Sequence, residues 1–123
     1  MAKLLFNITN GTNNPTKASL GFMLARTAVE EGHEVTVFLN ADAVSLIRKP
    51  VLESLVGLGT GKLSEHFNIL IDAKVPIYVS AISCEIRGVT EKDLEEANSI
   101  KVFPKTLLNL SLIHISEPTR QDR

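Results

Sequence analysis

The single cysteine of the chain lies among residues that can support thiol chemistry. Cys84 follows the apolar run 77–80, in a segment that predicts a strand ending in a short turn of helix. Loops after the carboxyl ends of strands are where α/β proteins tend to place their chemistry. The first turn of a helix favours a thiolate and Arg87 adds positive charge, whereas Glu85 opposes both effects. A small buried cysteine without chemistry is the alternative, and spacing alone does not decide between the two.

A second polar group comes directly after the first expected strand. It consists of Asn10, Gly11, Thr12 and Asn14, followed by Pro15. Amide hydrogens where a loop opens a helix bind anions such as phosphate or a sulfur oxyanion. The segment lacks the GxGxxG fingerprint and the Walker Lys-Ser/Thr ending, so a nucleotide site is weakly indicated. The alternative is a well-capped turn without a ligand.

No metal site and no cofactor is predicted. His33 and His66 lack a ligand at i+4, and both are interpreted as solvated surface residues. One cysteine excludes an intramolecular disulfide and a thiolate-rich zinc site within one chain.

Composition excludes several classes of function. The chain has 123 residues, 44% hydrophobic residues and a formal net charge of -1, which argues against nucleic-acid binding. It has no apolar stretch long enough for a membrane span and no signal peptide at its start. We therefore expect a cytoplasmic protein with no nucleic-acid or membrane partner.

Strand and helix patterns alternate along the chain, which predicts a single-domain α/β fold. Strands are expected at residues 3–9, 34–39, 77–80 and 99–103, and helices at 15–31, 40–49, 64–74 and from Thr90. The glycines in 56–61 predict a flexible loop, and Pro50 is expected to stop the second helix. The alternation of strands and helices favours a parallel, doubly wound sheet with Rossmann- or flavodoxin-like layering.

Three helix starts carry capping signals. Asn14 before Pro15 predicts the N-cap of the first long helix, and Thr90 with Asp93 predicts a capping box. Ser64 is expected to cap the third helix. On the first helix, the row containing Leu20, Leu24 and Ala28 is expected to face the sheet.

The end of the chain resembles a translated sequencing adapter. Read as codons, residues 110–120 match the transposon-end adapter used in library preparation. We therefore expect a native domain at 1–109, a non-native tail at 110–123 and a missing last native strand. The alternative is a native amphipathic end.

Three motifs in this order resemble the DsrE-like family. They are Asn-Pro-Thr at 14–16, Gly-His-Glu-Val-Thr-Val-Phe-Leu at 32–39 with Asp-Ala-Val at 42–44, and Pro-Ile-Tyr-Val at 76–79 leading to Arg-Gly-Val at 87–89. The resemblance covers about residues 3–109. It implies a small parallel α/β fold, homo- or hetero-oligomers of DsrE-like chains, and a cysteine that carries persulfide sulfur. The usual position of that cysteine corresponds to Ser83, with another sometimes at Ser80, so Cys84 is offset by one residue.

Two functions follow from the residues and the resemblance together. In the first, the protein is a sulfur-relay or sulfur-trafficking carrier, with Cys84 as the catalytic nucleophile that accepts persulfide sulfur from a donor protein. Arg87, Ser80 and Ser83 would then stabilise the anion. In the second, it is a non-catalytic oligomeric module that holds a small anion or nucleotide between residues 10–14 and 80–84. A sulfur exposed toward the first loop favours the relay, and a buried Cys84 favours the module.

Overall fold

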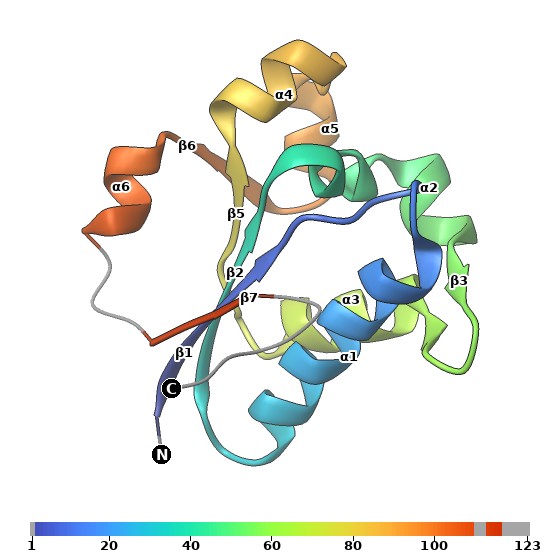
Figure 1. The fold of residues 1–123 in the computed structure, drawn as a ribbon, viewed down its shortest axis with the longest axis vertical. Helices are drawn as coiled ribbons and strands as arrows, with labels where there is room; N and C mark the ends of the chain where they lie inside the picture. The colour runs from blue at the N-terminus through green and yellow to red at the C-terminus, as the bar shows by residue number, and fades with distance from the viewer. Residues whose placement is uncertain (1, 110–112, 117–123) are drawn as a thin grey trace.

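The computed structural model of the protein describes residues 2–109 and 113–116. Within them, one parallel sheet of five strands has the order β6-β5-β2-β1-β7 (Figure 1). Its strands are β1 (Lys3–Ile8), β2 (Glu34–Leu39), β5 (Ile77–Ser80), β6 (Ser99–Val102) and β7 (Ile113–Ser116). The predicted α/β fold with a parallel sheet is confirmed.

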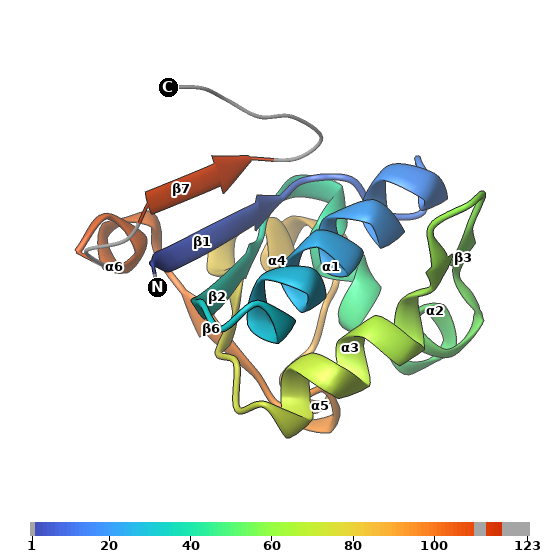
Figure 2. The ribbon, with the colours of Figure 1, turned by 90° about the horizontal axis from the view of Figure 1, so that it is seen from below.

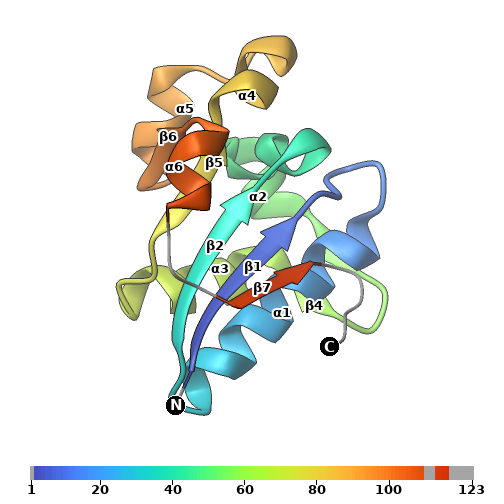
Figure 3. The same cartoon turned by 60° about the vertical axis from the view of Figure 1, so that its left-hand side comes forward.

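Helices connect the strands and cover the sheet mainly on one face. They are α1 (Pro15–Glu30), the 3-10 helix η1 (Ala41–Ile47), α2 (Lys49–Ser54), α3 (Leu63–Asp72), α4 (Ala81–Arg87), α5 (Glu91–Glu96) and α6 (Pro104–Leu108). The path β1, β2, β5, β6 advances one place at each step, so right-handed crossovers put their helices on the same face. Figure 2 shows α1 and α3 side by side on that face, and Figure 3 shows α4 and α5 together at the end of β5.

The main hydrophobic core lies between the sheet and these helices. Strand residues such as Phe6, Val37 and Val79 alternate toward it, where they meet Phe22 of α1 and Phe67 of α3. A smaller cluster, formed by Leu5, Phe38 and Val102, lies on the opposite face. β2 is buried from its second residue to its end, as expected for a strand covered on both faces.

Two of the three predicted helix caps are present. The Asn14 side chain accepts a hydrogen bond from the Lys17 amide at 3.1 Å, with Pro15 at the first helical position. Thr90 and Asp93 form both bonds of a capping box at α5. These starts are therefore fixed by local side-chain chemistry.

Other local predictions were wrong. Pro50 does not stop a helix but lies in the first turn of α2, where its missing amide hydrogen costs nothing. Lys62, not Ser64, precedes α3, and it makes no side-chain cap bond. The glycine segment forms a short antiparallel hairpin, β3 (Val56–Gly57) and β4 (Gly61–Lys62), rather than an open loop.

The buried face of α1 also differs from the expected one. Its buried residues are Ala18, Ser19, Gly21, Phe22, Ala25 and Ala28, whereas Leu24 is 40% exposed. Small residues allow the helix to approach the sheet closely, and Ile8 packs directly over Gly21. The periodicity was helical, but the leucine row did not identify the packing face.

The predicted adapter-derived tail overlaps the described residues only at 113–116. These residues form β7, which pairs in parallel with β1 at the sheet edge. Residues 110–112 and 117–123 lie outside the described residues. The non-native origin of the tail and the missing native strand stay predictions. None of the described helices combines the length and apolar character needed to cross a bilayer.

Replacing Phe22 by alanine should destabilise the fold much more than replacing Leu24. Phe22 is fully buried against the ring of Phe67, so Phe22→Ala is expected to lower the free energy of unfolding by about 3–5 kcal/mol. Leu24→Ala, on the same helix, is expected to cost less than about 1 kcal/mol. Urea denaturation of both variants measures the difference, and equal losses would contradict the assigned packing face.

Candidate functional site

The predicted site residues leave the sheet at its carboxyl end, from two strands that are not neighbours. Residues 10–14 follow β1 and Ser80 ends β5, but β2 lies between these strands. The start of η1 therefore occupies the space between the two predicted loops. Gly11 touches it so closely that a Cβ there would lie 2.2 Å from the Asp42 carbonyl oxygen. The structure does not bring the two loops together around one open site.

Two asparagines of the first loop make hydrogen bonds within the loop and to the start of α1. Asn13 accepts a hydrogen bond from the Gly11 amide at 2.7 Å and donates one to Asn10 at 3.0 Å. Asn14 caps α1, and Thr12 is exposed. This arrangement is that of a well-capped turn, and anion binding by these residues stays a prediction.

Ser80 and Ser83 both support the backbone at the start of α4. Ser80 is the N-cap and accepts from the Ser83 amide at 3.3 Å. The Ser83 hydroxyl donates to the Asn40 side-chain oxygen at 3.0 Å and accepts from the Ala41 amide at 3.0 Å. Ala41 has a φ of 50°, which is unfavourable for a residue with a Cβ. Ser83 therefore ties α4 to a strained turn at the end of β2.

Arg87 is committed to an ion pair on the side of α4 that faces η1. Its guanidinium contacts the Asp42 carboxylate, with Nη2 to Oδ1 at 3.2 Å. Arg87 is not among the charged groups that shift the pKa of Cys84. The structure thus gives no support to Arg87 as the cation that activates the thiol.

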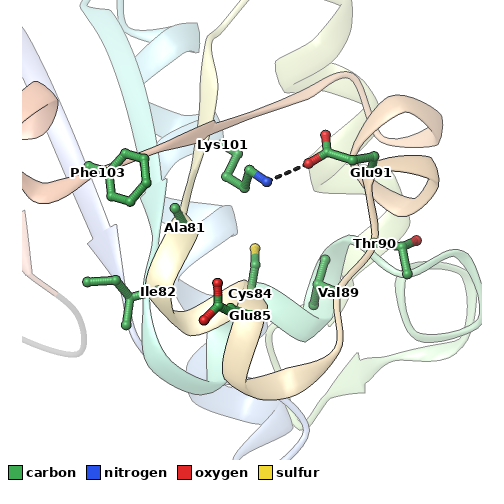
Figure 4. Close-up of a pocket in the computed structure, with 9 residues that line it drawn as sticks. All are labelled: Ala81, Ile82, Cys84, Glu85, Val89, Thr90, Glu91, Lys101 and Phe103. Atoms are coloured by element: carbon green, nitrogen blue, oxygen red, sulfur yellow. Dashed lines mark hydrogen bonds and ion pairs between the residues drawn. The ribbon is translucent and has the colours of Figure 1, made fainter.

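Cys84 faces a cavity of about 380 Å³ between α4, α5 and β6. Successive side chains of a helix point in directions roughly 100° apart, so Cys84 does not share the direction of Ser83. Figure 4 shows its sulfur directed toward Lys101 and Glu91, which form an ion pair across the cavity. The remaining lining residues are Ala81, Ile82, Glu85, Val89, Thr90 and Phe103. Cys84 therefore does not point to the first loop: it is a buried residue of the main hydrophobic core that forms part of the cavity wall.

The environment of Cys84 favours the neutral thiol. Cys84 is only 2% exposed and is the fourth residue of α4, so it lies past the first helical turn that was expected to favour a thiolate. Burial is the main effect and raises the pKa of the Cys84 thiol; Lys101 lowers this pKa and Glu91 raises it. The geometry therefore corrects the predicted activation of the thiol by the helix start.

Lys101 and Glu91 were missed as site residues by sequence reasoning. Glu91 was assigned to a helix start and Lys101 to a strand, which are both correct. Their meeting depends on the parallel pairing of β6 with β5, which places Lys101 beside Val79. The one available signal was that Lys101 and Phe103 share a strand face two residues apart.

His66 is buried, so its predicted surface position was wrong. One ring nitrogen lies 2.7 Å from the Thr60 carbonyl oxygen and the other 3.4 Å from the Arg26 guanidinium. Thr60 also accepts from the Ser19 hydroxyl, so this group holds the β3–β4 hairpin against α1. Among the described residues, no three His, Cys, Asp or Glu side chains cluster closely enough to hold a metal ion.

Removing the Ser83 hydroxyl should destabilise the protein measurably. Ser83→Ala loses two partly buried hydrogen bonds while Asn40 still holds the Ala41 amide, so a loss of about 1 kcal/mol is expected. Ser54→Ala removes an exposed hydroxyl bonded only within α2 and should change little. Urea denaturation gives both values. A Ser83→Ala loss no larger than that of the control would mean that the tie is not structural.

Alkylation of Cys84 should have its pH midpoint above that of an ordinary cysteine. Burial raises the pKa of Cys84, so the fraction of reactive thiolate stays low until the pH passes that raised value. The rate of reaction with iodoacetamide, followed by intact mass, gives the midpoint. The same chain in denaturing urea is the reference, and a folded midpoint at or below it would contradict the prediction.

Comparison with known proteins gives one family and several similar folds. The model of the DsrE/DsrF-like family matches residues 2–114. An uncharacterized protein of Methanocaldococcus jannaschii, MJ0760, is 36% identical over 103 residues, which make up 84% of this chain and 38% of that protein. The chain thus spans well under half the length of this relative.

Two solved structures share the fold. The crystal structure of the YchN protein from E. coli matches with a TM-score of 0.73 at 18% identity, covering 94% of this chain and 98% of that one. BT1422, a conserved protein of unknown function from Bacteroides thetaiotaomicron, has a TM-score of 0.66 at 15% identity, with 94% of each chain covered. At these identities the similarity shows the fold alone.

Proposed function

The chain belongs to the DsrE/DsrF-like family, and from this membership and the cavity at Cys84 we propose that it is a sulfur carrier that accepts persulfide sulfur on Cys84. The observation that carries the proposal is the direction of the only thiol in the chain, into a cavity that also holds a lysine side chain. Neighbouring cysteines are absent from the chain, so a bound sulfur atom has no internal thiol to which it can be lost.

The proposed step is a sulfur transfer without net oxidation. The Cys84 thiolate attacks the outer sulfur of a donor persulfide, and a new S–S bond forms at Cys84 while the donor S–S bond breaks. The donor leaves as a thiolate and takes up the proton that Cys84 lost. The product is a Cys84 persulfide, and release to an acceptor thiol is the same step in reverse.

The cavity suits this step because the thiol is shielded from water while two of the lining residues are exposed. Cys84 is almost fully buried, so its sulfur meets a donor only through the cavity. Ile82 and Phe103 line the cavity and are more than half exposed. They offer an apolar rim against which a donor protein, or another DsrE-like chain in an oligomer, would pack.

Incubation with a cysteine desulfurase, cysteine and its cofactor should add one sulfur atom to the chain. Intact mass detects the addition, and a reducing agent should remove it because a persulfide is cleaved by thiols. Cys84→Ala, a small substitution at the same buried position, should remain unmodified. An unmodified wild-type mass under conditions that load a known acceptor would refute the carrier function.

A second function is favoured by the burial of Cys84 and its raised pKa. In it, the protein is an oligomeric module that binds a small anion or nucleotide and performs no thiol chemistry. The two functions differ in the dependence on sulfur: the module keeps its assembly and binding in Cys84→Ala and takes up no sulfur in the wild type. The desulfurase experiment therefore separates them.

A further inference from the structure

We propose that Lys101 is the residue that compensates negative charge on the Cys84 sulfur, and that its ion pair with Glu91 limits this effect. The inference deepens the carrier function proposed above by assigning the group that stabilises the attacking thiolate and the bound persulfide. It concerns the ionisation of Cys84 itself, so it can be tested without any sulfur transfer.

The parallel pairing of β5 and β6 brings Lys101 to the cavity. Lys101 is the partner of Val79, and paired residues of neighbouring strands project from the same face. Val79 packs into the main core, and α4 begins two residues later on that same side. Lys101 and Cys84 therefore approach the cavity from two walls, as Figure 4 shows.

Lys101 is the one cationic side chain among the described residues that line the cavity. Glu85 and Glu91 are its anionic lining residues. Arg48 also lowers the pKa of Cys84 and Asp93 raises it, both less than Lys101 and Glu91 do, and neither lines the cavity. The Arg48 Nη2 donates to the Arg87 and Gly88 carbonyl oxygens at 2.9 and 2.6 Å, and its Nε lies 3.6 Å from Asp93. Lys101 is therefore the cavity residue whose positive charge can stabilise a sulfur anion.

Glu91 holds the ammonium group in the resting state, but only weakly. The Lys101 Nζ lies 2.5 Å from Oε2 of Glu91, and the side chains are 42% and 76% exposed. Exposed ion pairs contribute little free energy because water screens them. A sulfur anion in the same cavity therefore competes with the Glu91 carboxylate for the positive charge of Lys101.

The charges in the cavity also predict opposite effects of the two partners. Removing Lys101 leaves a buried sulfur anion with two carboxylates, which disfavours ionisation of Cys84. Removing the charge of Glu91 eliminates one carboxylate and leaves the Lys101 ammonium unpaired. Both changes favour ionisation of Cys84. A purely structural ion pair would give no such opposition, because loss of either partner would disturb the cavity in the same direction.

The test is the pH profile of iodoacetamide alkylation of Cys84 in the full chain, followed by intact mass. Lys101→Met should move the midpoint to higher pH and slow alkylation at a fixed pH below it, by roughly tenfold for each whole pH step that the midpoint moves. Glu91→Gln should move the midpoint to lower pH and accelerate alkylation. Lys101→Arg should stay near the wild type. The limiting rate at high pH should be similar in all variants, because access to the sulfur is unchanged.

Two matched controls lie on α5. Lys92→Met and Glu95→Gln remove the same charges from exposed positions that do not line the cavity, and both should leave the midpoint unchanged. If Lys101→Met does not fold, Lys101→Gln replaces it, since a polar side chain suits the half-exposed position.

Midpoints equal to those of the controls would overturn the proposal, as would a shift in the same direction for Lys101→Met and Glu91→Gln. A change confined to the limiting rate would also overturn it, because that result reports access to the thiol and not its charge. The two proposals fail separately. Opposite midpoint shifts without sulfur loading would refute the carrier function and support the role of Lys101. Sulfur loading without midpoint shifts would support the carrier function and refute the role of Lys101.

Discussion

The hydrogen bonds between Ser83, Asn40 and Ala41 are the constraint on which the site depends. They fasten the first turn of α4 to the end of the central strand β2, where Ala41 keeps a positive φ. A helix held at one residue has its rotation fixed, and every following side chain takes its direction from that contact. Cys84 consequently turns away from the first loop and toward β6. The hydrogen bonds of Ser83 thus set the direction of Cys84 toward the cavity, although they involve no cavity residue.

Arg48 adds a second link between the elements that surround the cavity. It joins the two carbonyl oxygens at the end of α4 to the carboxylate of Asp93 at the start of α5. Both helices are short, so neither is stable by its own backbone bonds. The guanidinium thus links the end of α4 to the start of α5. The pKa of Asp93 is lowered, chiefly by its hydrogen bond to the Thr90 backbone, so the carboxylate stays charged for Arg48.

Local sequence signals predicted the fold well and the site only in part. β2 and β5 have their expected bounds, and Asn14 and Thr90 cap the helices that they were expected to cap, because these features depend on residues close in the chain. Cys84 was identified from its place after a strand. Its surroundings were not, since the neighbours Lys101 and Glu91 arrive through strand pairing and the return of α5. The position of β2 between β1 and β5, which separates the two predicted loops, was likewise not given by any local signal in the sequence.

The adjacent positions 83 and 84 lie on different sides of one short helix. Ser83 faces the turn after β2, whereas Cys84 faces the cavity beside β6. A thiol at either position keeps its place in the sequence motif but meets different neighbours and is approached from a different direction. A single-residue shift along α4 therefore decides whether a side chain meets the end of β2 or the cavity beside β6, while the sheet that carries the helix stays the same.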